Sequence, residues 1–122
     1  MLLKSVKKWN KSLQHIRIKK PSFSPDLRGA DLTGRDLTGA DLSEAVLRSA
    51  KLQRANLTLA KLEDANLTSA NLESANLECA FLHAANLERA NLKGAKLNEG
   101  EKLYGLYLEG TDLTEQTSVG QT

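Results

Sequence analysis

The hydrophobic positions of this chain recur with a period of five residues over most of its length. A leucine stands at every fifth position from Leu27 to Leu97. Alanine stands two positions before each of these leucines, except where Pro25 and Arg35 take its place. The slot between alanine and leucine is mostly polar, and the two slots after leucine are rich in turn-prone residues. A fixed short period of this kind indicates a stacked repeat architecture.

A period of five does not fit a regular helix or a flat strand. On an α-helix, five residues advance a side chain by about 140°, so successive leucines would spiral around the helix. On a flat strand, where side chains alternate, a step of five moves each leucine to the opposite face. The pattern therefore predicts a chain that bends after every unit and stacks its coils into a solenoid, with leucine and alanine pointing inward.

The repeated phrase, seen in Ala65-Asn66-Leu67-Thr68-Ser69, closely resembles the pentapeptide-repeat family. The resemblance covers residues 25–115. It implies an all-β solenoid, namely a right-handed quadrilateral β-helix of about four to five coils with four repeats per coil. Residues twenty apart would then stack, placing Asn66 beside Asn86 in a surface ladder of side-chain amides and Asp31 and Asp41 beside lysines of opposite charge.

The expected domain organisation has three parts: a helix in residues 1–21, the solenoid in residues 22–115 and a disordered tail in residues 116–122. The spacing of six between Leu97 and Leu103 predicts a one-residue bulge or loop there. Most glycines stand two residues after a repeat leucine, where the chain should turn a corner, some of them with positive φ. These glycines are Gly29, Gly34, Gly39, Gly94, Gly105 and Gly110.

The N-terminal segment differs in charge from the repeats. Residues 1–21 hold seven basic residues and no acidic one, which leaves ten basic and fifteen acidic residues for the remainder. Apolar residues share one helical face, so the segment is predicted to form an amphipathic helix ended by Pro21. These apolar residues are Leu2, Val6, Trp9, Leu13 and Ile16.

Three functions are open for this helix. Its apolar face can cap the open N-terminal coil, around Leu27 to Leu42. Its basic face can instead contact an anionic membrane or a partner protein. The third possibility is a targeting peptide. The basic residues concerned are Lys4, Lys7, Lys8 and Lys11.

Candidates for chemistry are few. Cys79, His83, Glu63 and Asp64 could be imagined as metal ligands, but their spacing matches no closed ligand set, and we interpret them as solvated surface residues. We find no paired nucleophile and base and no phosphate-binding glycine loop. The sequence therefore predicts no enzymatic activity, catalytic residue, cofactor or metal. Two interpretations are open for Phe81, with Tyr104 and Tyr107 a coil further on. They form an exposed aromatic patch that contacts a partner, or they are covered by the C-terminal segment.

The single cysteine fits a reducing cytosol, and the sequence lacks a membrane span and a signal peptide, so a cytoplasmic location is expected. The resemblance implies a non-enzymatic, often bacterial, scaffold for protein association whose partner is unknown. It is expected to be a monomer or a weak dimer through a solenoid end.

Two alternative functions remain. One is the DNA mimicry of family members that bind type II topoisomerases, but here the charges of the outward stacks alternate in sign, which does not favour mimicry. Nucleic acid is not expected as a partner either. The other is a peripheral membrane adaptor that uses the basic helix.

Overall fold

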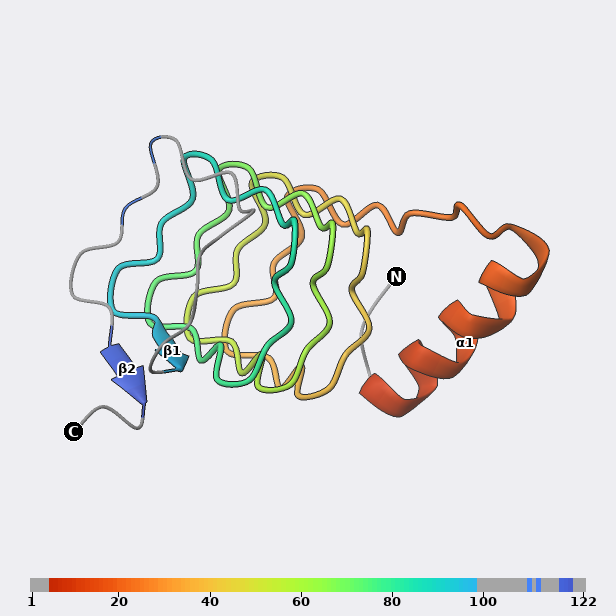
Figure 1. The fold of residues 1–122 in the computed structure, drawn as a ribbon, viewed down its shortest axis with the longest axis horizontal. Helices are drawn as coiled ribbons and strands as arrows, with labels where there is room; N and C mark the ends of the chain where they lie inside the picture. Colours follow the sequence, from red (N-terminus) through yellow and green to blue (C-terminus); the bar gives the residue numbers. More distant parts are fainter. Residues whose placement is uncertain (1–4, 99–109, 111, 113–116, 120–122) are drawn as a thin grey trace.

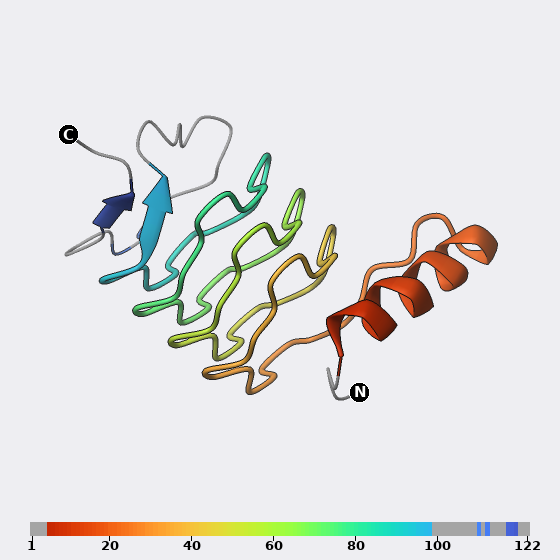
Figure 2. The same cartoon turned by 90° about the horizontal axis from the view of Figure 1, so that it is seen from below.

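A computed structural model describes residues 5–98, 110, 112 and 117–119. Helix α1 spans Val6–Lys19, and the two short strands are β1 (Lys96–Asn98) and β2 (Thr117–Val119). Between α1 and β1 the chain winds into a rod of stacked coils, with the helix at its N-terminal end (Figures 1 and 2). The predicted solenoid is therefore present.

Isolated parallel bridges join residues that lie twenty apart, for example Val46 to Asn66 and Asn66 to Asn86. One turn of the rod thus contains twenty residues, or four of the five-residue units. Each bridge occupies only the polar slot, because the two residues that follow the inward leucine turn the corner. For this reason the described part of the rod has no strand longer than three residues, although its neighbouring coils are joined by hydrogen bonds in every unit.

The hydrogen bonds of one unit show how the coils are joined. The N–H of Asn66 donates to the carbonyl of Ala45 in the preceding coil (2.9 Å), and the carbonyl of Asn66 accepts from Leu47 (2.7 Å). The N–H of Leu67 donates to Asn86 in the following coil (2.7 Å), and the N–H of Ala70 closes the corner on the carbonyl of Leu67 (2.9 Å). Backbone groups of an interior unit are thus paired with both neighbouring coils.

The inward assignment of leucine and alanine is confirmed. Every repeat leucine from Leu27 to Leu97 and every repeat alanine from Ala40 to Ala95 is buried, most of them completely. Arg35, in the slot of an alanine, is only half-buried. The alternation of a large and a small inward residue fills a narrow interior and leaves the polar slots outside.

The corner slot has positive φ throughout the described repeats, and glycine is not required there. Gly29, Gly34, Gly39, Gly94 and Gly110 have φ of 66 to 71°. Gly105 lies outside the described residues. Ten further corners have φ of 57 to 62° without glycine. They are Glu44, Ser49, Arg54, Leu59, Asp64, Ser69, Ser74, Cys79, Ala84 and Arg89. The corner geometry of the stacked coils outweighs the local preference of these residues.

We expect Arg54→Gly to stabilise the protein slightly. Glycine relieves a left-handed conformation that costs an L-residue roughly 1 to 2 kcal/mol, and part of this gain is offset by the greater freedom of the unfolded chain. The free energy of unfolding in urea should rise by up to about 1 kcal/mol. Arg48→Gly, at an exposed neighbouring corner position where φ is not positive, is the control and should destabilise. A loss of stability in both variants would contradict the strain argument.

The repeat slips by one residue near its C-terminal end, as predicted. Asn71 bridges Asn91 at a distance of twenty residues, whereas Asn91 bridges Asp112 at twenty-one. The parallel pairing of β1 with β2 also joins Lys96 to Thr117, twenty-one residues later. The predicted place of the insertion, together with Leu103, lies outside the described residues.

Strand β2 falls within residues 116–122, which we predicted to be a disordered tail. The structure differs here, because Thr117–Val119 continue the ladder by pairing with β1. Backbone pairing with an exposed coil edge orders a polar segment that contains no repeat leucine.

Candidate functional site

The N-terminal end of the rod presents a coil with no coil before it. Here the first coil means residues 26–45. Inside the rod, Lys61 donates its N–H to Ala40, and its carbonyl accepts from Leu42, both in the preceding coil. The equivalent groups of Asp41 would need partners near residues 20–22. These residues do not form a coil, since they follow the helix, so the backbone at Asp41 must find partners elsewhere.

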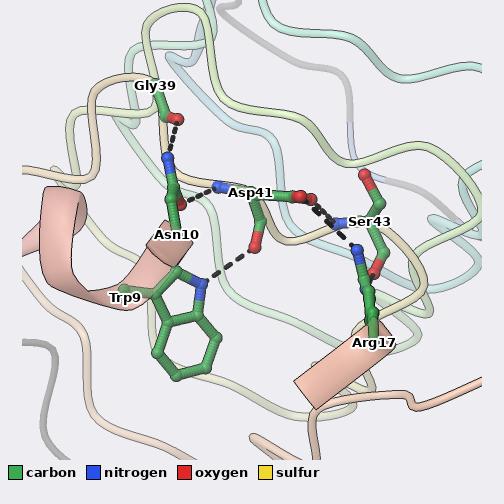
Figure 3. Close-up of polar contacts among 6 residues, drawn as sticks. All are labelled: Trp9, Asn10, Arg17, Gly39, Asp41 and Ser43. Carbon is green, nitrogen blue, oxygen red and sulfur yellow. Dashed lines mark hydrogen bonds and ion pairs between the residues drawn. The ribbon is translucent and has the colours of Figure 1, made fainter. Parts of the chain in front are cut away.

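Side chains of α1 supply these partners (Figure 3). The side-chain oxygen of Asn10 accepts from the N–H of Asp41 (2.7 Å), and the indole N–H of Trp9 donates to the carbonyl of Asp41 (2.8 Å). The Asn10 amide also donates to the carbonyl of Gly39 (2.9 Å). Trp9 and Asn10 therefore replace, at this edge, the two backbone groups that a preceding coil would offer.

Arg17 also takes the place of a backbone donor that a preceding coil would offer, two residues further along the first coil. In the interior the carbonyl of Glu63 accepts from Glu44, and at the end of the rod the matching carbonyl of Ser43 accepts from the Arg17 guanidinium. Arg17 also lies 3.4 Å from a carboxylate oxygen of Asp41. Because this ion pair is partly exposed, it contributes at most about 1 kcal/mol. The helix is thus fixed along residues 39–43, one side of the first coil.

The central part of the apolar face of α1 is buried. Trp9 and Leu13 are buried, and Trp9 joins the core cluster that contains the repeat leucines. Val6 packs against this cluster while half-buried, and Ile16 is also half-buried. Leu2 lies outside the described residues. The helix begins at Val6, after the N-cap Ser5, and ends at Lys19, so it is shorter than the predicted range of 1–21.

The polar slot of the first coil is acidic at all four of its positions, and these carboxylates are held by local hydrogen bonds. The carboxylates of Asp31 and Asp36 each accept from the N–H two residues later. Hydrogen bonds from the side chain and backbone of Thr33 lower the pKa of Asp31, and those of Thr38 lower the pKa of Asp36. The Arg28 guanidinium likewise lowers the pKa of Asp26. This rim therefore stays negatively charged at neutral pH.

The predicted stacks are in register, but their side chains interact differently from our expectation. Asn66 bridges Asn86, yet each side-chain oxygen accepts from the backbone two residues later in its own coil, at 3.1 and 3.0 Å. The amide side chains thus stabilise the corners, as turn-forming residues do. Asp41 bridges Lys61, but the carboxylate of Asp41 is paired with Arg17.

The predicted contact residues fall on separate surfaces. Lys7, Lys8 and Lys11 are exposed on α1, and Lys4 lies outside the described residues. Phe81 is 49% exposed and bridges Lys61 on the side of the rod. Tyr104 and Tyr107 lie outside the described residues, so their grouping with Phe81 remains a prediction.

Two exposed apolar residues near Lys61 were missed by the sequence analysis. Leu59, two residues before Lys61, is 49% exposed, and Ile18 on α1 is 75% exposed. A groove beside Lys61 is lined by Asp41 of the first coil and by four residues of α1, namely Asn10, Gln14, Arg17 and Ile18. The available signal was that both residues are apolar at positions where the pattern calls for polar ones.

The remaining candidates form no recognisable centre. Within residues 5–98, 110, 112 and 117–119, no three His, Cys, Asp or Glu residues are grouped so that they could hold a metal ion. Cys79 and His83 are exposed. The same described ranges contain no helix long and apolar enough to cross a membrane.

The twenty-residue coils, the leucine and alanine interior and the capped end define a β-solenoid built from five-residue units. The family model for pentapeptide repeats matches residues 26–64 and 65–99. The chain therefore belongs to the pentapeptide repeat family. No curated protein matches the sequence.

Among solved structures, a pentapeptide repeat protein from Nostoc PCC 7120 is 33% identical, with a TM-score of 0.57, 80% of this chain covered and 94% of that one. A pentapeptide repeat protein from the cyanobacterium Cyanothece 51142 is 36% identical over 76% of this chain and 63% of that one, with a TM-score of 0.44. HetL, a pentapeptide repeat protein involved in heterocyst differentiation regulation in Nostoc PCC 7120, is 35% identical, with a TM-score of 0.39, 75% of this chain covered and 42% of that one.

Proposed function

We propose that this chain is a non-enzymatic, rigid scaffold that binds a partner protein through one side of the rod. Proteins of its family are generally non-enzymatic scaffolds. We further propose that the rod is of the right-handed quadrilateral type, with four to five coils. Because its interior is filled by leucine and alanine, any binding must use an outer face or an end.

The observation that carries this proposal is the grouping of exposed apolar side chains around Lys61. In the described part of the chain, the large hydrophobic residues with substantial exposure are Ile18, Leu59 and Phe81. Phe81 bridges Lys61 from the next coil, Leu59 precedes it by two residues, and Ile18 shares a groove with it. We call Ile18, Leu59, Lys61 and Phe81 the Lys61 face.

This composition suits a protein surface better than a nucleic-acid mimic. Exposed apolar side chains beside a cation are typical of protein contact sites, whereas a DNA mimic needs a continuous track of negative charge. The stack Asp41, Lys61 and Phe81 has no such track. Membrane attachment through Lys7, Lys8 and Lys11 is the competing function, and it uses a different surface.

The test is site-specific photo-crosslinking in the cell of origin. A photoreactive phenylalanine analogue is placed at Phe81 in one variant. In the control it is placed at Lys51, one and a half coils earlier and therefore on another side of the rod. We expect a discrete crosslinked protein from position 81 that disappears when Leu59→Ser and Ile18→Ser are added. Identical products from positions 81 and 51 would overturn the proposal. It would also be overturned if the chain were recovered only in the membrane fraction and this recovery required the lysines of α1.

A further inference from the structure

A cavity of about 200 Å³ lies where α1 and the segment after it meet the first coil. Its apolar walls come from both sides, since three residues belong to the helix and three follow it. They are Trp9, Leu13, Ile16, Phe23, Pro25 and Leu27. Ile16 and Phe23 are half-buried, and the other four are buried. The Lys61 face is a different surface, because it shares no residue with this lining.

The polar groups of the lining lie at the edge of the cavity. They are Ser12 and Asp26, and both residues are exposed. The carboxylate of Asp26 accepts from the Arg28 guanidinium, at 2.9 and 2.8 Å. Among the described residues, no basic side chain belongs to the lining. The interior of the cavity is therefore apolar, with a polar group only where it opens.

This lining disfavours a charged occupant. An anion would meet no cation in the lining and would lie near the carboxylate of Asp26. An ammonium group would compete with Arg28 for the same carboxylate. Burying a charge without a partner is costly, so a neutral occupant fits best. Water is also disfavoured, because a buried water needs two to four polar partners, whereas apolar cavities of about 150 Å³ stay dry and accept a molecule of the size of benzene.

We propose that this cavity binds a neutral molecule with a single aromatic ring. The ring lies against Trp9, Leu13 and Leu27, and a hydroxyl or N–H group of the ligand points to the polar edge. The volume limits the apolar body to about one ring, which excludes a long acyl chain. This ligand site is independent of the protein-binding face proposed above. Because the ligand contacts both α1 and the rod, it also favours the packed position of the helix.

The experiment titrates the full chain with 2-phenylethanol, phenylacetate and phenethylamine, which share a benzyl group and differ in charge. The reporter is the NMR signal of the indole N–H of Trp9, the single tryptophan of the chain. We expect a saturable shift with 2-phenylethanol, and at least about tenfold weaker binding of the two charged compounds. Absence of a saturable shift with 2-phenylethanol would overturn the proposal, as would equal or tighter binding of either charged compound.

Intermolecular nuclear Overhauser effects locate the ligand in the unmodified protein. The ring protons should contact the methyl groups of Leu13, Ile16 and Leu27. Contacts with the exposed methyl groups of Ile18 and Leu59 in their place would contradict the assignment.

A matched pair of variants on the same helix tests the site a second time. Ile16→Phe should fill the cavity and abolish the shift, with circular dichroism confirming that the fold is kept. Ile18→Phe makes the same exchange at a residue that is 75% exposed and lies outside the lining, so it should leave binding unchanged. An equal loss of binding in both variants would contradict the proposed site.

Hydrogen exchange tests whether the ligand bridges the helix and the rod. The amide of Asp41 donates to Asn10 of α1, so its exchange reports on release of the helix. A ligand that binds only while α1 is packed should slow this exchange about tenfold when present at ten times its Kd. The amide of Asn66, which donates to Ala45 inside the rod, should be unaffected. Unchanged exchange at Asp41 would show that the ligand does not contact both walls, and the proposal would be wrong.

Discussion

Replacing Leu67 by alanine is expected to lower the free energy of unfolding by about 2 to 5 kcal/mol. Leu67 is completely buried in the middle of the rod, with Leu47 one coil before it and Leu87 one coil after it. The backbone of this interior unit is hydrogen-bonded to both neighbouring coils, so the walls cannot collapse easily around the missing side chain. Urea denaturation followed by circular dichroism measures the loss.

The chain offers a matched control for this substitution. Leu59→Ala removes the same atoms from a side chain that is 49% exposed, and it should cost much less. An inward residue that is too large should also destabilise the protein. Ala70→Leu would overpack a buried position and should lower the free energy of unfolding by about 1 to 3 kcal/mol. If Leu67→Ala and Leu59→Ala lowered the free energy of unfolding equally, the stability of the rod would not depend on the size of its inward side chains, and the prediction would be wrong.

The solenoid was predictable because one physical requirement repeats in every unit. A leucine that returns every five residues can reach a common interior only if the chain bends after each unit, so the inward positions of Leu67 and Ala70 followed from the spacing. The one-residue slip before Asp112 was visible for the same reason.

Features set by tertiary contacts were not predictable in the same way. The positive φ of Arg54 follows from the corner geometry of neighbouring coils, and its own preference would not indicate it. The pairing of Thr117 with β1 depends on an exposed edge far away in the sequence. The sequence placed Trp9 on the apolar face of a helix, but the use of its indole N–H at Asp41 became visible only in the structure.

Replacing Trp9 by alanine is expected to weaken the packing of α1 on the first coil by about 3 to 5 kcal/mol, because it removes a buried aromatic side chain that joins the two. It also leaves the carbonyl of Asp41 without its indole partner. Trp9→Phe keeps most of the apolar contact but loses the hydrogen bond to Asp41. The loss of this bond should weaken the packing of α1 by about 1 kcal/mol.

The loss should be local, because each coil of a solenoid contacts only its neighbours and the rod can outlast the release of its cap. Hydrogen exchange makes this visible. The amide of Asp41, which donates to Asn10, should exchange much faster in Trp9→Ala, whereas the amide of Asn66, which donates to Ala45, should keep its protection. Unchanged protection at Asp41 would show that Asn10 and Arg17 hold the helix without Trp9. A parallel loss at Asn66 would instead show that the cap and the rod unfold as one unit.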